Sequence, residues 1–276
     1  MKGKLVKSII EIIETLQNIT DIFLSLFLFI AFMLPLICVV VQSMSTNASI
    51  NFVFYGIEAA SPTIAAIIVL SISRTCKDFL MKYFHSKHLL MAVVLPVIIV
   101  CLTMFLAKII FCFIVKIDFT VDSVSGVQFI IILWSLIAEE IGWRGYLLPF
   151  LSEHMKRSCL APAIVGVIWC LWHYHYFMFG GMDVPIVWFF LSCIVESYIY
   201  SYLLDLTDNN LISAMIYHFE WNWFIHVFAI NSNDNRGNTL PYIILVVLEI
   251  VIGFLLSLTV KKKGLIKEKS SKVLDM

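Results

Sequence analysis

A short segment in the middle of the chain places three ionisable side chains inside an apolar run. Residues 138–145 read Ala-Glu-Glu-Ile-Gly-Trp-Arg-Gly and follow the uncharged run 127–136. A charge at bilayer depth costs at least ~2.5 kcal/mol, so such residues usually face a polar interior and mark function. On a helix, the adjacent Glu139 and Glu140 point about 100° apart, whereas Glu140 and Arg144 lie four apart on one face, acid first. We predict a structural ion pair between Glu140 and Arg144, which leaves Glu139 free to face a cavity and do chemistry.

The same three charges also have a purely structural explanation. They could form one network in a transporter or in an inert helical bundle, and this segment alone does not distinguish such a network from an active site. The choice depends on which other polar residues the helices place beside Glu139.

The composition excludes an ordinary soluble domain. The chain has 276 residues, of which 61% are hydrophobic and 14% charged, with a mean hydropathy of +0.95, whereas soluble domains are about 45–50% apolar and about 25% charged. The fold class we predict is an all-α integral membrane protein. The net charge of zero gives no indication of a nucleic-acid partner. The seven cysteines form no Cys-x-x-Cys pair, and we interpret them as reduced thiols rather than a disulfide framework or a metal cluster.

Apolar runs of about 20 residues predict a bundle of eight membrane-spanning helices. They lie at about residues 22–41, 52–73, 89–115, 127–150, 159–179, 186–204, 211–230 and 240–260. This membrane domain, residues 20–260, follows a basic segment 1–19 whose isoleucines recur at helical spacing, as in an amphipathic helix on the membrane surface. A lysine-rich tail, residues 261–276, ends the chain.

Basic residues are unequally distributed between the two sets of loops. They concentrate at the amino terminus, in the tail and in residues 74–88 and 152–158, and they are few or absent in residues 42–51, 116–126, 180–185 and 231–238. With eight spans the two sets fall on opposite sides of the membrane. Because cytoplasmic loops carry the excess of Lys and Arg, we expect both termini to be cytoplasmic.

Two further spans carry pairs of polar or aromatic residues near mid-depth. Trp169 and His173 lie four apart in the fifth span, where an indole can pack against and orient an imidazole. His218 and Asn222 lie four apart in the seventh span, and both side chains can donate hydrogen bonds. Glu139 and His173 can be level with each other in adjacent antiparallel helices.

This set of groups is suited to peptide hydrolysis. A carboxylate beside an imidazole, such as Glu139 with His173, can position and deprotonate a water molecule. His218 and Asn222 could then donate hydrogen bonds to the oxyanion that forms. A metal variant stays open, in which Glu139, His173 and His218 bind a divalent metal such as zinc. The chain has no His-Glu-x-x-His motif, which excludes a zincin site.

The three motifs in this order resemble the CPBP family, also called the Abi or CAAX-protease family. The motifs are Glu-Glu-x-x-x-Arg (Glu139, Glu140, Arg144), an aromatic residue four before a histidine (Trp169, His173) and His-x-x-x-Asn (His218, Asn222), within residues 137–222. The resemblance implies a bundle of eight spans and an intramembrane endopeptidase, either a metalloprotease or glutamate-dependent. It implies that Glu139 and His173 activate water, that His218 and Asn222 form the oxyanion site, and that Glu140 and Arg144 support it. Trp169 stands where the family usually has Phe.

Other polar residues in the spans are weaker candidates. Glu196 could line a substrate cavity, although such an acid is more often satisfied by neighbouring hydroxyl groups. His175 and His226 could be second-layer or metal-binding residues. The remaining three are assigned no role in the site: Lys108, Glu220 and Glu249.

The leading hypothesis is an endopeptidase that cleaves a lipidated or membrane-associated peptide or protein, as in CAAX processing or in bacteriocin or pheromone maturation. The alternative is a non-catalytic immunity or scaffold protein that binds a bacteriocin-like peptide or a partner. A transporter loses support because no pair of Gly- or Pro-interrupted spans recurs in two halves. The Lys-, Asn- and Ile-rich composition is typical of a bacterial protein, and we expect it in the plasma membrane.

Overall fold

The computed structural model of the chain is built from helices. It describes the backbone of residues 2–155, 157–235 and 237–274, and the side chains of residues 21–155, 157–235 and 237–262. Within these residues no β-strand occurs, and the predicted all-α fold is confirmed. The predicted amphipathic segment 1–19 and most of the basic tail 261–276 lie outside the residues whose side chains are described.

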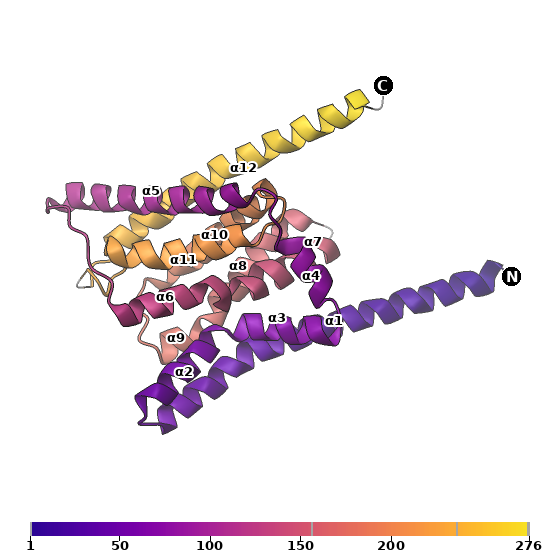
Figure 1. Ribbon diagram of the computed structural model, residues 1–276, viewed down its shortest axis with the longest axis horizontal. Helices are drawn as coiled ribbons and strands as arrows, with labels where there is room; N and C mark the ends of the chain where they lie inside the picture. The colour runs from indigo at the N-terminus through magenta and orange to yellow at the C-terminus, as the bar shows by residue number, and fades with distance from the viewer. Residues whose placement is uncertain (1, 156, 236, 275–276) are drawn as a thin grey trace.

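The helices pack as a bundle in which the long elements run roughly side by side (Figure 1). In chain order the elements are α1 (Lys2–Met44), α2 (Ala48–Ala59), α3 (Ser61–Ile72), α4 (Cys76–Tyr83), α5 (Leu89–Val115), α6 (Gly126–Ala138), the π-helix η1 (Ile141–Leu147), α7 (Leu148–His154), the 3₁₀ turn η2 (Ser158–Leu160), α8 (Ala161–Trp172), α9 (Tyr174–Met178), α10 (Ile186–Leu206), α11 (Ile212–Val227) and α12 (Leu240–Leu274). Helix α11 packs against α5 and α6, α10 packs against α8 and α12, and α1 packs against α2 and α3. The three motifs lie at the ends of α6 and α8 and within α11.

Several helices are long and apolar enough to cross a membrane, so the chain is an integral membrane protein. Five pass by length and composition: Asp21–Met44, Leu89–Val115, Gly126–His154, Ile186–Leu206 and Leu240–Lys262. A sixth span is formed if the bent pair α2 and α3 counts as one. The predicted count of eight is not confirmed, because α8 has 12 residues and α11 has 16, which is too short to pass on their own.

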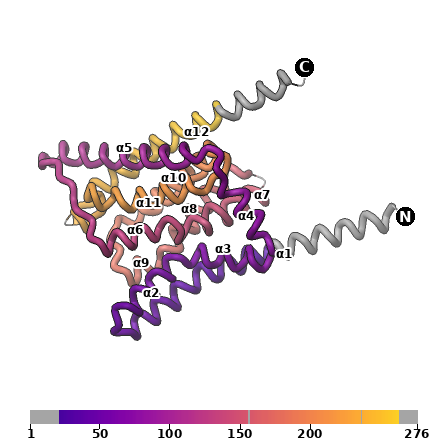
Figure 2. Tube along the Cα trace, viewed as in Figure 1, coloured from indigo at the N-terminus to yellow at the C-terminus, as the bar shows by residue number. Residues whose placement is uncertain are grey.

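The connecting segments gather at two ends of the bundle. At one end, Lys82 Nζ of α4 lies 3.6 Å from Glu153 Oε1 of α7, and Asn210 Nδ2 donates to the His85 carbonyl at 2.8 Å. At the other end, the Asp122 N–H donates to the Val227 carbonyl at 2.8 Å. The described ends of α1 and α12 lie at the same end as α4 and α7 (Figure 2). The loops predicted to be basic thus share one end of the bundle.

Three of the spans predicted to be continuous helices are interrupted. The pair α2 and α3 bends by 60°, just before Pro62. The span 127–150 breaks where α6 ends, because Glu139 leaves helical geometry at φ −122° and ψ −40°, and the chain continues as the π-helix η1. Helix α8 ends at Trp172, so His173 joins it to the short α9. Two predicted site residues, Glu139 and His173, therefore lie at helix breaks. The break at Glu139 is followed by a π-helix, an element that frequently occurs at functional sites.

The break after α6 is held by contacts with the start of α3. Thr63 Oγ1 donates to the Ile137 carbonyl at 2.9 Å, which satisfies an acceptor near the helix end. Gly142 lies directly against α3, because a Cβ atom there would be 2.5 Å from the carbonyl carbon and oxygen of Pro62. Only a residue without a side chain permits this approach, and it fixes η1 against α3.

Candidate active site

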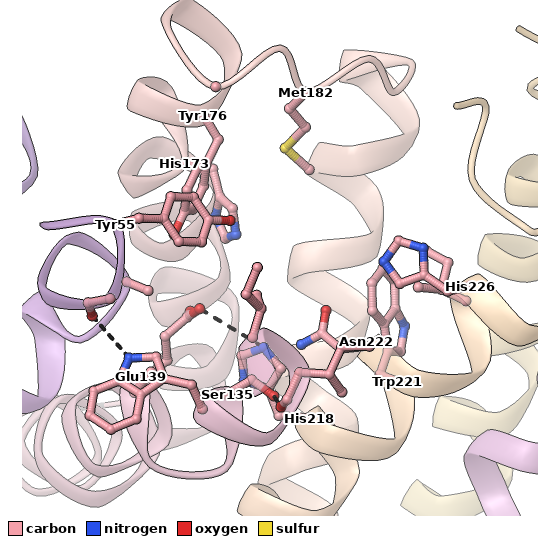
Figure 3. A pocket seen from close by; sticks show the side chains of 18 of the residues that line it. Tyr55, Ser135, Glu139, His173, Tyr176, Met182, His218, Trp221, Asn222 and His226 are labelled. Atoms are coloured by element: carbon pink, nitrogen blue, oxygen red, sulfur yellow. Dashed lines mark hydrogen bonds and ion pairs between the residues drawn. The ribbon is translucent and has the colours of Figure 1, made fainter. Parts of the chain in front are cut away.

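The three motifs meet at one cavity of about 1010 Å³ inside the bundle. Glu139, Trp169, His173, His218 and Asn222 all line it, together with apolar residues of α2 and α6. Figure 3 shows Glu139 directed toward His218, with Asn222 beyond His218 and His173 on another wall. The fold thus brings together residues that are far apart in the sequence.

Glu139 is buried, and one of its carboxyl oxygens accepts a hydrogen bond while the other makes none. The indole Nε1–H of Trp169 donates to Glu139 Oε2 at 2.7 Å. Glu139 Oε1 lies 3.9 Å from His218 Nε2, which is longer than a hydrogen bond. Lone pairs of Oε1 are therefore available to a third group in the cavity.

The predicted ion pair between Glu140 and Arg144 is present and fully buried. Arg144 Nη1 donates to Glu140 Oε1 at 3.1 Å, and Nη2 donates to Ser197 Oγ of α10 at 3.3 Å. The guanidinium carbon lies 4.2 Å from the ring centroid of Trp169 and 3.8 Å from that of Tyr200. Such stacking suits the flat, weakly hydrated guanidinium group of arginine.

Glu140 also has a second contact that the sequence pattern did not indicate. His218 Nδ1 lies 2.8 Å from Glu140 Oε1, so one carboxylate oxygen meets both Arg144 and a histidine of the third motif. The ion pair predicted to be purely structural therefore also orients His218. No local spacing reveals this contact, because the two residues are on different helices and far apart in the sequence.

His173 is oriented by the backbone of its own helix. Its Nδ1 lies 2.7 Å from the Trp169 carbonyl. A carbonyl only accepts hydrogen bonds, so Nδ1 carries the proton and a neutral imidazole keeps its lone pair on Nε2. The rings of Trp169 and His173 meet edge to face at 5.4 Å, the contact predicted from their spacing.

Asn222 lies one turn beyond His218 on α11 and faces the same cavity (Figure 3). Its side-chain amide makes no hydrogen bond to another of the described residues. The amide is only partly buried, unlike His218. Its donors are therefore available to a bound molecule.

The other polar candidates fall in different places. His175 is buried away from the cavity, with Nε2 3.3 Å from Glu58 Oε1. His226 lines the cavity, with Nδ1 3.0 Å from Asp234 Oδ2. Glu196 also lines it, whereas Glu220 and Lys108 do not. Of these residues, Glu196 and His226 can contact a molecule in the cavity.

The three residues considered as metal ligands do not fit a metal ion in this arrangement. Nδ1 of His173 faces the Trp169 carbonyl and Nδ1 of His218 faces Glu140, so only the Nε2 atoms of the two rings could bind a metal. Among the residues that the structure describes, no three His, Cys, Asp or Glu side chains are grouped as a metal ion requires.

Comparison with known proteins points to one family of membrane proteases. A family model described as type II CAAX prenyl endopeptidase Rce1-like matches residues 123–224, which include all three motifs. The CAAX prenyl protease 2 of Methanococcus maripaludis is 26% identical over 200 residues, which cover 63% of this chain and 71% of that protein. Both similarities agree with the motifs and with the cavity that they line. Over residues 123–224 the chain is therefore similar to the type II CAAX prenyl endopeptidases, as its resemblance to the CPBP family implies.

Proposed function

We propose that this protein is an intramembrane endopeptidase that hydrolyses a peptide bond of a lipidated or membrane-associated substrate inside the cavity. The observation that carries the proposal is the approach of Glu139 Oε1 to His218 Nε2, at 3.9 Å across the cavity, with Asn222 and His173 on the same walls. A carboxylate and hydrogen-bond donors facing one space are what the addition of water to a carbonyl requires.

In the first step, Glu139 and His173 position and deprotonate a water molecule. Glu139 Oε1 has free lone pairs, and Nε2 of His173 has one because Nδ1 carries the ring proton. The water oxygen bonds to the carbonyl carbon of the substrate, and its proton passes to one of these two bases. The negative charge moves to the former carbonyl oxygen.

His218 and Asn222 stabilise that oxyanion. For His218 to donate from Nε2 while Nδ1 donates to Glu140, the imidazole must carry both protons. Protonated His218 with Arg144 then balances the charges of Glu139 and Glu140, which favours this state in a buried site. Asn222 supplies a second donor from its amide.

In the last step, the tetrahedral intermediate collapses and the bond between carbon and nitrogen breaks. The proton taken from water passes to the leaving nitrogen, which departs as an amine, and the other product is a carboxylic acid. Glu139 and His173 return to their starting protonation states.

The relative and the cavity wall support a lipidated peptide as the substrate. The relative is a CAAX prenyl protease, so a prenylated peptide is the first substrate to test. Apolar residues of α2 and α6 line the cavity and suit a lipid chain. A leader peptide of a bacteriocin or a pheromone precursor is the second kind of substrate to test.

We further propose that the chain crosses the membrane eight times with both termini in the cytoplasm, in a bacterial plasma membrane. Support comes from the positions of the loops, because the basic segments of residues 74–88 and 152–158 share one end of the bundle. In this topology α8 with α9, and α11, are short crossings packed between longer helices.

The proposed activity is tested with the purified full-length protein in detergent. A fluorogenic peptide with a prenylated CAAX-type end and the same peptide without the lipid are incubated with the wild type and with Glu139→Gln. Because Glu139→Gln removes a proposed general base, it is expected to slow cleavage at least about 100-fold. Glu220→Gln, a change of the same kind outside the cavity, is the matched control and should cleave like the wild type.

Each measurement is repeated with a chelator, which reports on any dependence on metal. If the folded wild type cleaves none of these peptides, and a cellular phenotype survives Glu139→Gln, the protein is not an endopeptidase of this kind. That result would favour a non-catalytic immunity or scaffold protein.

A further inference from the structure

A second polar cluster borders the cavity and takes no part in the proposed hydrolysis. It consists of Ser192 and Glu196 on α10, Trp221 on α11, and Tyr242 and Glu249 on α12. We name these five residues the carboxyl cluster. Glu196, Trp221 and Tyr242 line the same cavity as Glu139. Trp221 also precedes Asn222 in the sequence and lies beside it in Figure 3.

The two glutamates of the cluster are bridged by one serine. Ser192 Oγ lies 2.5 Å from Glu196 Oε1 and 3.1 Å from Glu249 Oε2. Trp221 Nε1 donates to Glu249 Oε1 at 3.0 Å. A serine hydroxyl has one hydrogen, which Ser192 shares between the two carboxyl groups, with the shorter contact to Glu196. Ser192 therefore holds the two carboxyl groups close together.

The cluster has polar atoms that no described residue satisfies. Glu249 uses both oxygens, but Glu196 Oε2 has no hydrogen bond to any described residue, although only 4% of Glu196 is exposed. The hydroxyl group of Tyr242, a residue only 1% exposed, likewise lacks a hydrogen-bond partner among the described residues. Such groups are costly to bury without a partner, which indicates that a bound molecule completes their hydrogen bonds.

The charges along the cavity wall indicate the sign of that molecule. Among the described residues that line the cavity, three carry carboxyl groups and none is Lys or Arg. The carboxyl groups belong to Glu139, which the protonated His218 balances, and to the exposed Asp183 and the buried Glu196, which lie outside that pair. A negatively charged, partly desolvated wall attracts a cationic group far more strongly than a neutral one.

We propose that the carboxyl cluster is a substrate-binding subsite that accepts a cationic group of the peptide, the side chain of a lysine or arginine near the cleaved bond. The ammonium or guanidinium group donates to Glu196 Oε2 and to the Tyr242 oxygen, while Ser192 and Glu249 fix the carboxyl of Glu196. This inference rests on the proposed function and adds a preference within its substrate class.

The test compares two prenylated fluorogenic peptides that differ at one position, which is lysine in one and norleucine, of similar length and uncharged, in the other. A separate pair of peptides is made for each of the three positions on either side of the cleaved bond. For the wild type, kcat/KM is expected to be roughly tenfold higher with lysine at one of these positions, as for a charge-assisted hydrogen bond. In Glu196→Gln this ratio should fall to about one. Glu220→Gln should keep the ratio of the wild type.

Binding provides a second measurement that does not depend on turnover. In the Glu139→Gln background, the Kd for the lysine peptide should be roughly tenfold lower than for the norleucine peptide, and adding Ser192→Ala should reduce the difference. Cleavage of both peptides at equal rates at every position would overturn the cationic subsite and leave the endopeptidase intact. Absence of any cleavage together with a retained binding preference would instead refute the endopeptidase.

Discussion

Two adjacent glutamates divide the work of the candidate site because they meet different partners. Glu139 faces the cavity and accepts from the indole of Trp169. Glu140 is fully buried and accepts from Arg144 while it contacts His218. The site thus couples a carboxyl group that faces the cavity to a charged network that holds His218 in place.

We predict that Glu140→Gln lowers stability and activity together. A neutral amide leaves Arg144 buried without a full charge partner, so the free energy of unfolding should fall by about 3 kcal/mol. It also removes the acceptor that orients His218. Thermal unfolding in detergent and peptide cleavage measure the two effects. Glu139→Gln is the matched comparison: it should retain the melting temperature and lose only cleavage, and equal melting temperatures for both variants would refute this division of roles.

Trp169 contributes a hydrogen bond that phenylalanine, the usual residue of the family at this position, cannot make. We predict that Trp169→Phe keeps the edge-to-face contact with His173 but lowers kcat about tenfold, because a hydrogen bond to a charged group contributes about 1.5 kcal/mol. Steady-state cleavage kinetics measure the effect. Trp223→Phe, the same change outside the cavity, should leave kcat unaltered. An unaltered kcat in Trp169→Phe as well would mean that the indole of Trp169 acts only by packing.

At the scale of secondary-structure elements, the breaks in the helices set the direction of the site residues. Glu139 ends α6 and His173 ends α8. Where a chain leaves helical geometry, a side chain can turn away from the helix face that the sequence spacing implies. The π-helix η1 then places Arg144 under Trp169 and Tyr200 while it preserves the contact of Arg144 with Glu140.

A substitution at Gly142 tests whether the π-helix η1 depends on its contact with α3. We predict that Gly142→Ala lowers both the melting temperature and cleavage, because the added Cβ atom would lie 2.5 Å from backbone atoms of Pro62. Overpacking of this kind costs typically about 1–3 kcal/mol. Gly126→Ala is the control, since its Cβ would meet nothing within 4 Å. If the two variants melt at the same temperature, the approach of η1 to α3 is not what holds the break.

The sequence predicted the partners within each motif but not the contacts between motifs. Pairs four residues apart, such as Glu140 with Arg144, follow from helical periodicity and are present. The helix breaks at Glu139 and His173 were not predicted, because they depend on side chains of other helices, such as Thr63 bonding the Ile137 carbonyl. For the same reason the contact between Glu140 and His218 could not be inferred from spacing.

At the scale of the whole molecule, α8 and α11 are shorter than a helix that crosses a membrane alone. At about 1.5 Å per residue, 12 and 16 helical residues span less than the about 30 Å of a bilayer core. Both helices nevertheless connect loops at opposite ends of the bundle, and they carry or border the residues that line the cavity. Short helices enclosed by longer ones can therefore place the site at membrane depth.

We predict that loops alternate between the two sides of the membrane along the whole chain. Short epitopes inserted in the full-length protein at residues 116–126 and 180–185 should be accessible from outside intact cells, and epitopes at residues 84–88 and 205–210 only after permeabilisation. The second pair is linked at one end by the hydrogen bond of Asn210 to His85, so its two members must agree. Peptide cleavage in membranes checks that each insertion preserves the fold. If the epitope at residues 180–185 is protected while that at 116–126 is exposed, α8 and α9 form a re-entrant segment, and the cavity opens to a different side from the one the charge distribution implies.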